Sequence, residues 1–503
     1  MSLKFSPTKR RFLTGGAAAL TVLPTWRRAV AARGYDLIVV GAGTAGMPAA
    51  IFAAKRGAKV LVIERTNVLG GTLDRAQGQL SAAGTRLQKS KGIEDSAEAH
   101  FADCLRINAE TADPALTRLA TTHAAETIDW LTDIGYVISD NYPTLGGHEP
   151  YMTKRCYNGP DGARGILKAM QGPFEAAVKA GKIDLRLDTG AIDLIQDRSG
   201  AVVGVTIKAD GGKAEDLMGA NVLLAAGGCA ANPRMFEEIH GVPLYAQAAR
   251  PSSQGAGLML GQGAGATLRY ADRYVPLFGA LMADDSLPGD MSGGLENYPE
   301  RRLPWELWVN AHGRRFIRED HQSPNAREQS LGRQPGHRLG MVLNRDILER
   351  ASPAIRGWTK EKYVAAFGSN AMFAEGGTLE ELAINAGVNP RGLIETVTDY
   401  NTALKDGAID PLGRQHRPAA IDKGPYLAAR FQGWTLFSFA GLAADASLRV
   451  LRADGTPIPN LFAAGEILGA TATSGQAYTN GMLLTPSMTF GRLVGQRFAK
   501  LQA

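Results

Sequence analysis

The sequence is poor in cysteine, has no long apolar run and carries little net charge, and each absence excludes a class of protein. Its three cysteines, Cys104, Cys156 and Cys229, are widely spaced and form no C-x-x-C pair. This spacing argues against an iron–sulfur cluster, a zinc site or attached haem. Buried free thiols are the expected state, and the alternative is one disulfide. No run of about 18 apolar residues occurs, so we expect no transmembrane helix.

Charge gives no support to a nucleic-acid partner. The net charge is only +6 for 503 residues, and several of the excess lysines and arginines fall within residues 1–33. The rest of the chain is therefore closer to neutral. A chain of this length suffices for two or three domains with sizeable cores.

The N-terminal segment has the pattern of an export signal. The basic run 9–11 precedes Phe12-Leu13, a weakly apolar stretch follows at 15–24, and small residues at 29–32 end the segment. This order resembles a twin-arginine signal with an A-x-A cleavage site. We therefore expect residues 1–32 to direct the protein to the periplasm. The alternative is a disordered basic tail on a cytoplasmic protein.

Residues 35–64 predict a phosphate-binding unit of strand, turn and helix. The apolar run 37–40 fits a buried parallel strand, which ends at Gly41-Ala-Gly43-Thr-Ala-Gly46 before an alanine-rich helical pattern. Gly41 allows the tight turn, Gly43 lets a pyrophosphate approach the backbone, and Gly46 permits close packing of helix on strand. The N-terminus of the helix offers unpaired N–H groups to the phosphates.

Two later features indicate which dinucleotide binds. A second apolar run, 60–63, ends at Glu64, whose carboxylate can accept hydrogen bonds from a ribose diol. The following Gly70-Gly71-Thr72 resembles the loop that folds over the FAD pyrophosphate in flavoproteins, and residues 457–466 resemble their late strand, P-x-L-[FY]-A-A-G-E. Because these motifs lie at both ends of the chain, we expect FAD and a domain inserted between them.

The middle of the chain changes character. Helical patterns occur at 115–131, 359–367, 378–386 and 390–405, and strand patterns at 183–187, 191–195, 202–207 and 222–226. Residues 276–433 are rich in Arg, Pro and Trp. We predict an α/β protein with a Rossmann-type FAD-binding domain (33–275 plus 434–503) and an inserted α+β substrate-capping domain (276–433).

Taken together, the motifs resemble those of the FAD-dependent fumarate reductase/succinate dehydrogenase flavoprotein family. Besides the glycine motifs, they are Ala-Gly-Gly at 226–228, N-x-x-G-x-R-F at 310–316, V-L-x-x-D-G-x-P-I-P at 450–459 and T-F-G-R at 489–492. The resemblance implies FAD bound mainly without a covalent link and a cap domain over the isoalloxazine. It also implies hydride transfer between flavin N5 and the carbon β to an activating carbonyl.

The motifs and the matching family positions give the expected cofactor-binding residues. These are Gly41, Gly43, Ala45, Gly46, Glu64, Arg65, Gly70, Gly71, Thr72, Gly78, Gln79, Ala226, Gly227, Gly465, Glu466, Leu483 and Leu484. Thr72, Gly78 and Gln79 stand where family members bring backbone amides to the flavin. Nothing pairs His312 or His321 into a metal site, so no metal is expected.

The departures from the family pattern concern the substrate. Phe437 stands where fumarate reductases have a histidine that holds one substrate carboxylate, and Tyr478 stands where they have the arginine that clamps the other. A carboxylate left unpaired in a closed pocket is costly, so a small dicarboxylate is disfavoured. Tyr478, Gly481 and the following P-x-M-T-F-G look like the ketosteroid dehydrogenase pattern Y-P-G…P-A-M-T-F-G, one residue out of step and without its proline.

Three residues are candidates for catalysis. We expect Tyr478 to act as the base, with its phenol pKa lowered by nearby donors, while backbone N–H groups near Gly481 polarise the carbonyl. Tyr274 stands near the family's substrate histidine, and Arg327 follows R-F-x-x-E as the family's acid arginine does, after a longer loop. The alternatives are packing tyrosines and a solvated arginine at a helix start.

These features predict an exported FAD-dependent oxidoreductase, a dehydrogenase that introduces a C=C bond α,β to a ketone or related carbonyl. The alternative within enzymes is the reverse reaction, an enoate reductase of the fumarate type with Arg327 as acid. The alternative of another class is a flavin electron carrier without turnover, which a large cap disfavours. Because the chain has no haem motif, electrons must be exchanged with a separate cytochrome, a quinone or oxygen.

Overall fold

A six-stranded sheet carries the glycine motif. The computed structural model describes residues 34–497. The elements of this sheet are β1 (Leu37–Val40), α1 (Gly46–Lys55), β2 (Val60–Ile63), β5 (Ile183–Arg186), β9 (Val222–Leu224), β18 (Arg449–Leu451) and β19 (Pro457–Ala463). The strand order is β18-β19-β9-β1-β2-β5, and only the edge strand β18 is antiparallel to its neighbour. β1, β2 and β9 are apolar and buried throughout, as expected of parallel strands covered on both faces.

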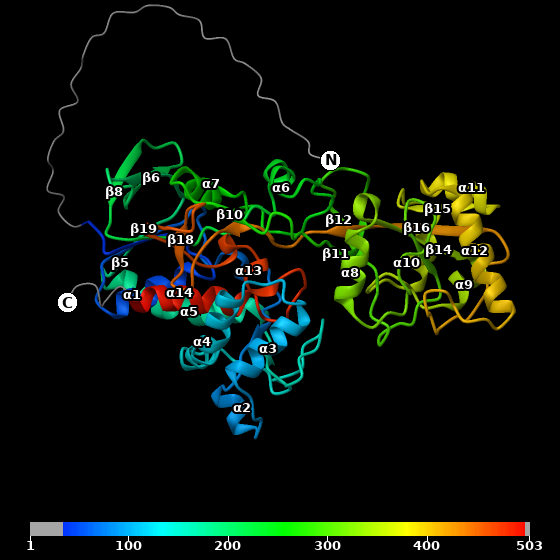
Figure 1. Cartoon of the computed structure of the whole chain (residues 1–503), viewed down its shortest axis with the longest axis horizontal. Helices are drawn as coiled ribbons and strands as arrows, with labels where there is room; N and C mark the ends of the chain where they lie inside the picture. The colour runs from blue at the N-terminus through cyan, green and yellow to red at the C-terminus, as the bar shows by residue number, and fades with distance from the viewer. Residues whose placement is uncertain (1–33, 498–503) are drawn as a thin grey trace, which may run out of the picture. The chain divides into compact units, whose positions relative to one another are not determined.

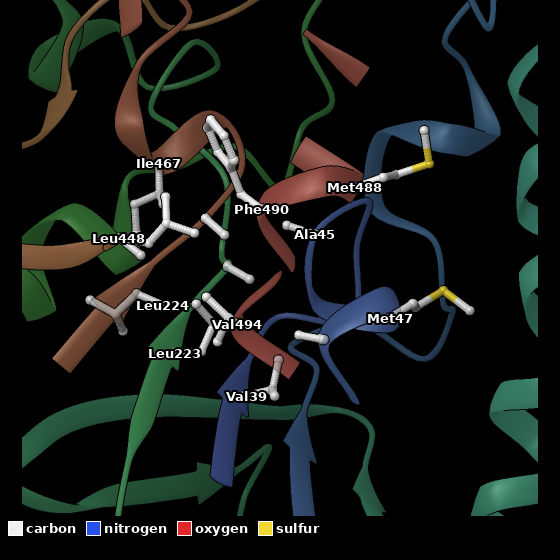
Figure 2. Packing of buried hydrophobic residues seen from close by; sticks show 14 of the residues in the cluster. Val39, Ala45, Met47, Leu223, Leu224, Leu448, Ile467, Met488, Phe490 and Val494 are labelled. Carbon is white, nitrogen blue, oxygen red and sulfur yellow. The ribbon is translucent and has the colours of Figure 1, made fainter. Parts of the chain in front are cut away.

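The last described helix packs against the first. α14 (Leu484–Arg497) lies along α1; α4 (Pro114–Asp133) contacts α14, and α5 (Gly162–Lys179) contacts α1. Figure 2 shows Val39 of β1 and Leu223 of β9 in one cluster with Phe490 and Val494 of α14. The two ends of the sequence that carry cofactor motifs therefore share one hydrophobic core.

The other elements outside residues 277–434 are small sheets and helices. β6, β7 and β8 form an antiparallel sheet, β3 pairs with β4, and β10 pairs with β17. Their bounds are η1 (Gly71–Asp74), β3 (Leu80–Ser81), α2 (Arg86–Ser90), α3 (Ala97–Ile107), β4 (Cys156–Tyr157), β6 (Thr189–Gln196), β7 (Val202–Ala209), β8 (Ala214–Met218), α6 (Pro233–His240), α7 (Ala256–Gly263), β10 (Leu268–Arg269), β17 (Gly441–Leu442), η3 (Glu466–Leu468) and α13 (Thr471–Ser474).

A second sheet is built from residues 277–434 (Figure 1). Its order is β12-β11-β16-β14-β13, β15 also pairs with β16, and every pairing is antiparallel. The elements are β11 (Leu277–Met282), β12 (Met291–Gly294), β13 (Leu307–Val309), α8 (Pro324–Gly332), η2 (Pro335–His337), β14 (Arg338–Asn344), α9 (Arg345–Arg350), α10 (Lys360–Ala366), β15 (Phe373–Gly376), α11 (Leu379–Ala386), α12 (Pro390–Lys405) and β16 (Tyr426–Trp434). Trp308, Met341 and Phe431 belong to a core of its own.

The predicted α/β class and the predicted helices are confirmed. The patterns at 115–131, 359–367, 378–386 and 390–405 correspond to α4, α10, α11 and α12. The strand predicted at 222–226 ends earlier, at Leu224, because the chain turns at Gly227 with φ +74°. All three cysteines are buried free thiols. The domain limits at 276 and 433 stay a prediction, and the predicted signal at 1–32 lies outside the described residues.

None of the helices in the described part of the chain combines the length and the hydropathy that crossing a bilayer needs.

Candidate active site

A cavity of about 1400 Å³ begins at the carboxyl ends of β1, β2 and β9 and extends to the second sheet. In open α/β sheets this edge is where ligands bind. The volume exceeds the range of roughly 300–1,000 Å³ that holds a single small ligand, so there is room for a dinucleotide and a substrate. We call the part lined by the glycine turn the cofactor end. The part lined by Phe437, Tyr478 and the second sheet is the substrate end.

The glycine turn is shaped by backbone contacts that leave no space for a side chain. Gly41 has φ +107°, and a Cβ there would lie 2.5 Å from the carbonyl oxygen of Ala225. A Cβ on Gly46 would lie 1.8 Å from the oxygen of Gly41. Gly46 therefore allows α1 to approach β1, as predicted, but it lies behind the cavity wall.

The start of α1 is open to an anion. The N-cap residue Ala45 gives no side-chain cap, and no acidic residue occupies the first turn. Gly43 and Gly71 line the cavity in front of this helix end, together with Thr72. Gly70 does not line the cavity; its φ is +101°, and a Cβ there would lie 2.7 Å from the Leu167 side chain. The N-terminus of α1, with the positive end of its dipole, and two glycines without side chains form a cradle for a pyrophosphate.

Glu64 fixes the turn from the neighbouring strand. Its Oε2 accepts the N–H of Ala42 at 2.9 Å, and its Oε1 accepts the N–H of Thr66 at 3.0 Å and the hydroxyl at 2.9 Å. Glu64 and Arg65 line the cavity directly after β2. The carboxylate is thus held where the motif predicts a ribose diol.

The rest of the cofactor end tests the fit to FAD. The remaining predicted residues on its wall are Gly78, Gln79, Ala226, Gly227, Gly465, Glu466, Leu483 and Leu484. Gln79 Oε1 is buried and has no hydrogen-bond partner within residues 34–497. An unpaired buried acceptor costs about 1–3 kcal/mol, so a donor on a bound group is expected to meet it. The pyrophosphate cradle, the ribose acid and this orphaned acceptor fit FAD.

Glu466 is a partly buried carboxyl at the same end. Its Oε1 accepts the N–H of Ser438 at 2.9 Å, which ties the loop after β19 to the segment before β17. Burial raises the pKa of Glu466 above its ordinary value. A carboxyl with a raised pKa is better able to stay protonated and donate a hydrogen bond to a polar ligand atom.

Phe437 and Tyr478 form an aromatic wall at the substrate end. Their ring centroids lie 6.2 Å apart with the planes 28° from parallel, and Phe437 also packs on Phe439 at 5.2 Å. The backbone N–H of Tyr478 donates to Asn325 Oδ1 at 3.2 Å, which anchors this loop to α8. Gly481 lies on the same wall.

The expected activation of Tyr478 is wrong in direction. We expected nearby donors to lower its pKa, whereas burial raises the pKa to about 12, with further increases from Cys156, Tyr298 and Glu328. The phenol therefore keeps its proton at neutral pH. Across residues 34–497 its hydroxyl has no hydrogen-bond partner, so it can donate to a ligand but is a poor base.

Three further ionisable residues at the substrate end were missed in the sequence: His148, Glu328 and Tyr298. His148 Nε2 lies 3.1 Å from Glu328 Oε1, and the His148 ring centroid lies 5.2 Å from that of Tyr478. They come from separate segments, so no spacing in the sequence connects them. The one signal was the place of Glu328 beside Arg327 in α8.

A polar group lines the substrate end beside Tyr298. It consists of Asn297, Arg301 and Arg356. The Arg301 guanidinium lies 4.8 Å from the centre of the Tyr298 ring, and Arg356, which is 54% exposed, pairs with Glu296 only at 3.7 Å. Burial raises the pKa of Tyr298, and the charges of Arg356 and Arg301 act against that rise. These cations can attract an anionic substituent on a substrate.

Arg327 and Tyr274 do not reach the cavity wall. Arg327 is fully buried and donates to the His321 carbonyl, and its Nε and Nη2 lack a partner within the described residues. Its guanidinium lies 5.5 Å from the Tyr298 ring, and burial lowers its pKa. The hydroxyl of Tyr274 bonds to Thr435 Oγ1 at 2.8 Å, and its ring packs in an aromatic cluster. Tyr274 is therefore a packing residue.

Comparison with known proteins decides the family. A family model of the FAD binding domain matches residues 36–480. The chain belongs to this family. FAD is accordingly its cofactor, in agreement with the fit of the cofactor end.

Three similar proteins narrow the chemistry. The chain is 29% identical over 467 residues to a fumarate reductase (cytochrome) of Shewanella frigidimarina, covering 92% of this chain and 77% of the relative. It is 25% identical over 548 residues to a 4-oxocyclohexanecarboxylate 2-dehydrogenase of Sinomonas cyclohexanicum, covering 92% and 93%. A solved 3-ketosteroid-Δ4-(5α)-dehydrogenase from Rhodococcus jostii RHA1, in complex with 4-androstene-3,17-dione, matches with a TM-score of 0.67 at 25% identity, over 96% and 99%.

The family predicted from the motifs is confirmed. The protein is an FAD-dependent oxidoreductase of the fumarate reductase family that acts on CH–CH groups. Membership of this enzyme family excludes the alternative of a flavin electron carrier without catalytic turnover. Within residues 34–497, no group of three or more His, Cys, Asp or Glu side chains is placed to hold a metal ion.

Proposed function

We propose that this protein is a dehydrogenase that introduces a C=C bond α,β to a ketone or related carbonyl. The observation that carries this is the pair Phe437 and Tyr478 on the cavity wall, an uncharged aromatic surface with one available hydroxyl. A carbonyl oxygen can accept a hydrogen bond from that hydroxyl while an apolar body packs on the rings. The relatives named as ketosteroid and 4-oxocyclohexanecarboxylate dehydrogenases support this substrate class.

The chain's own part is to hold the carbonyl and exclude water. Bound FAD supplies a hydride acceptor. Tyr478, protonated because burial raises its pKa to about 12, stabilises the negative charge that develops on the carbonyl oxygen as the α-proton leaves. A donor placed in this way typically contributes about 10²–10³ in rate. Leu277, Phe278 and Met291 supply apolar surface at the same end.

A second candidate is the reverse reaction, reduction of an enoate. Arg327, the expected acid of that reaction, has two buried nitrogens without partners in the described chain, but it lies behind the cavity wall, which counts against this direction. Arg301 and Arg356 on the wall offer cations to a carboxylate. The fumarate reductase relative is named for this direction.

Anaerobic mixing distinguishes the two directions. Oxidised holoenzyme is mixed with 4-oxocyclohexanecarboxylate or with 5α-androstane-3,17-dione, the saturated counterpart of the dione in the Rhodococcus complex. We expect the visible flavin band to bleach, and we expect fumarate to reoxidise chemically reduced enzyme slowly. Fast reoxidation by fumarate with no bleaching by either ketone would favour the reductase. No response to any of these compounds would contradict both candidates.

We further propose that electrons leave to a separate cytochrome, a quinone or oxygen, and that the enzyme works in the periplasm. The support for export is the signal-like pattern of residues 1–32. Changing Lys9, Arg10 and Arg11 together to Gln should leave folded, yellow precursor in the cytoplasm. An unchanged periplasmic yield would show that the segment is a tail and that the proposed location is wrong.

A further inference from the structure

Removal of an α-proton needs an acceptor, and this requirement rests on the proposed function. Three carboxylates line the cavity among the described residues: Glu64, Glu466 and Glu328. Both oxygens of Glu64 are engaged at the cofactor end, and Glu466 is tied to Ser438 beside the late strand. Glu328 is the carboxylate at the substrate end, where Tyr478 lies.

Glu328 is held in one orientation. It belongs to α8, whose N-terminus is capped by Ser323 through a bond from the N–H of Ala326 at 3.1 Å. One of its oxygens, Oε1, lies 3.1 Å from His148 Nε2, and the two side chains are only 8% and 10% exposed. Its other oxygen, Oε2, takes part in no hydrogen bond within residues 34–497. Glu328 therefore has one oxygen fixed and one available.

The pair Glu328 and His148 lies next to the proposed carbonyl donor. The His148 ring packs edge-on against the Tyr478 ring with 5.2 Å between centroids. The charge of Glu328 also contributes to raising the pKa of both Tyr478 and Tyr298. A hydrogen-bond donor for the carbonyl oxygen and a proton acceptor for the adjacent carbon are thus neighbours on one wall.

We propose that Glu328 is the catalytic base of this site and that His148 is its positioning residue. The C–H bond at the α-carbon breaks, and its proton forms an O–H bond with Glu328 Oε2. The electron pair stays with the substrate as an enolate, whose oxygen accepts the hydrogen bond of Tyr478. A carboxylate base paired with a tyrosine donor is a known solution to enolisation of a ketone. The step moves one proton and needs no oxidant.

Isotope exchange isolates this step from hydride transfer. The probe is 3,3,5,5-tetramethylcyclohexanone, which has α-hydrogens but no hydrogen on either β-carbon and so cannot be desaturated. Holoenzyme in D2O should exchange its α-hydrogens faster than buffer alone, as measured by mass spectrometry. Glu328→Gln should lower the enzymatic rate by about 10²–10⁴-fold, the usual worth of a positioned base. Glu328→Asp should recover part of it.

His148→Gln tests positioning separately. We expect a smaller loss of exchange, about 10-fold, with an unchanged dissociation constant for the ketone, because the carboxylate loses the contact that orients it. Glu300→Gln, an exposed carboxylate off the cavity wall, is the matched control and should exchange like wild type. FAD content and circular dichroism report whether each variant folds.

The outcomes separate this inference from the proposed function. Bleaching by a ketone together with full exchange in folded Glu328→Gln overturns the role of Glu328 and leaves the dehydrogenase standing. A fall in exchange equal for Glu328→Gln and Glu328→Asp overturns it as well, because a base should be partly restored by the shorter acid. Absence of both bleaching and exchange in the wild-type enzyme overturns both.

Discussion

At the cofactor end glycines bring the backbone to the cavity wall, whereas at the substrate end aromatic and polar side chains line it. Gly41, Gly43 and Gly71 shape the first, with one carboxylate, Glu64, bonded to the turn. Phe437, Tyr478 and their polar neighbours shape the second. A backbone-built site binds the part of the cofactor that does not vary, and a side-chain-built site can change its substrate without altering the fold.

The largest expected effect comes from filling the glycine turn. Gly46→Ala places a Cβ 1.8 Å from the Gly41 carbonyl oxygen. Neither atom can move aside, because the Cβ is fixed by the backbone of α1 and the oxygen belongs to the backbone of the turn. We expect a loss of about 3 kcal/mol or more of unfolding free energy and no retained FAD. Flavin absorbance and thermal unfolding measure both effects.

The control is Gly172→Ala inside α5, where no atom beyond the helix backbone and the two chain neighbours lies within 4 Å of the new Cβ. We expect the unfolding free energy to change by less than about 1 kcal/mol, because alanine is the better helix former while Pro173 disfavours helical backbone in the residue before it. If Gly46→Ala binds FAD as tightly as Gly172→Ala does, the backbone account of the cofactor end is wrong.

The next largest effect concerns the scaffold of the substrate end. Arg302 and Glu306 form a buried two-bond pair with both distances 2.9 Å, directly beside Arg301. Glu306→Gln leaves the Arg302 charge without its partner, which typically costs about 3–5 kcal/mol. We expect a lower unfolding midpoint in denaturant while FAD remains bound at low denaturant concentration. Asp346→Asn, in the exposed pair with Arg350, should change little.

The pair of Arg302 and Glu306 also predicts how the unfolding free energy changes with pH. Burial acts to raise the pKa of Glu306, but the charge and hydrogen bonds of Arg302 outweigh it, so the folded pKa lies below the ordinary 4.5. The stabilisation is therefore full above about pH 4.5 and is lost as the pH falls through the folded value. Unfolding free energy measured from pH 6 to pH 3 should fall less steeply in Glu306→Gln. An equal slope in both proteins would contradict this.

A moderate effect is expected from the ribose acid. Glu64→Gln removes a charge-assisted hydrogen bond to the Ala42 N–H and turns a donor toward Thr66. Hydrogen bonds from a ribose diol to the charged carboxylate contribute about 1.5–3 kcal/mol, so their loss corresponds to an FAD affinity weaker by about 10–150-fold. Fluorescence titration of the apoprotein with FAD measures this affinity. The control is Glu215→Gln, a change at an exposed glutamate. Equal affinities would show that Glu64 has no part in cofactor binding.

The smallest effect concerns the two wall arginines. The double variant Arg301→Gln, Arg356→Gln should raise KM for 4-oxocyclohexanecarboxylate about 5-fold, which corresponds to ~1 kcal/mol for solvent-screened charges. KM for its methyl ester should not change, and added salt should narrow the difference in the wild-type enzyme. An equal rise of KM for the acid and the ester would mean that these arginines shape the cavity and do not recognise the charge of the substrate.

Sequence reasoning located the cofactor end but only part of the substrate end. Gly41, Gly43 and Glu64 act within one strand–turn–helix–strand unit, so their local spacing carries their geometry. His148, Tyr298 and Glu328 lie in separate segments of the chain. They come together at the cavity only when the chain is folded. No local pattern encodes that meeting.

Family position alone also failed to give the chemistry of individual side chains. Tyr478 lines the cavity wall, but burial raises its pKa, whereas the role of base that its family position suggested requires a lowered pKa. Tyr274 matched a family position and is a packing residue bonded to Thr435. Burial and neighbouring charges, which set such properties, are visible only in three dimensions.

The most direct test of the account is the rate of flavin reduction by the best ketone substrate in Tyr478→Phe, compared with Tyr274→Phe. Both variants remove one hydroxyl, but only Tyr478 lies on the cavity wall. We predict that Tyr478→Phe keeps its FAD spectrum and is reduced about 10²–10³-fold more slowly, the usual cost of losing one donor to a developing oxyanion. Tyr274→Phe should react at close to the wild-type rate. Equal rates in the two variants would contradict the claim that Tyr478 holds the substrate carbonyl.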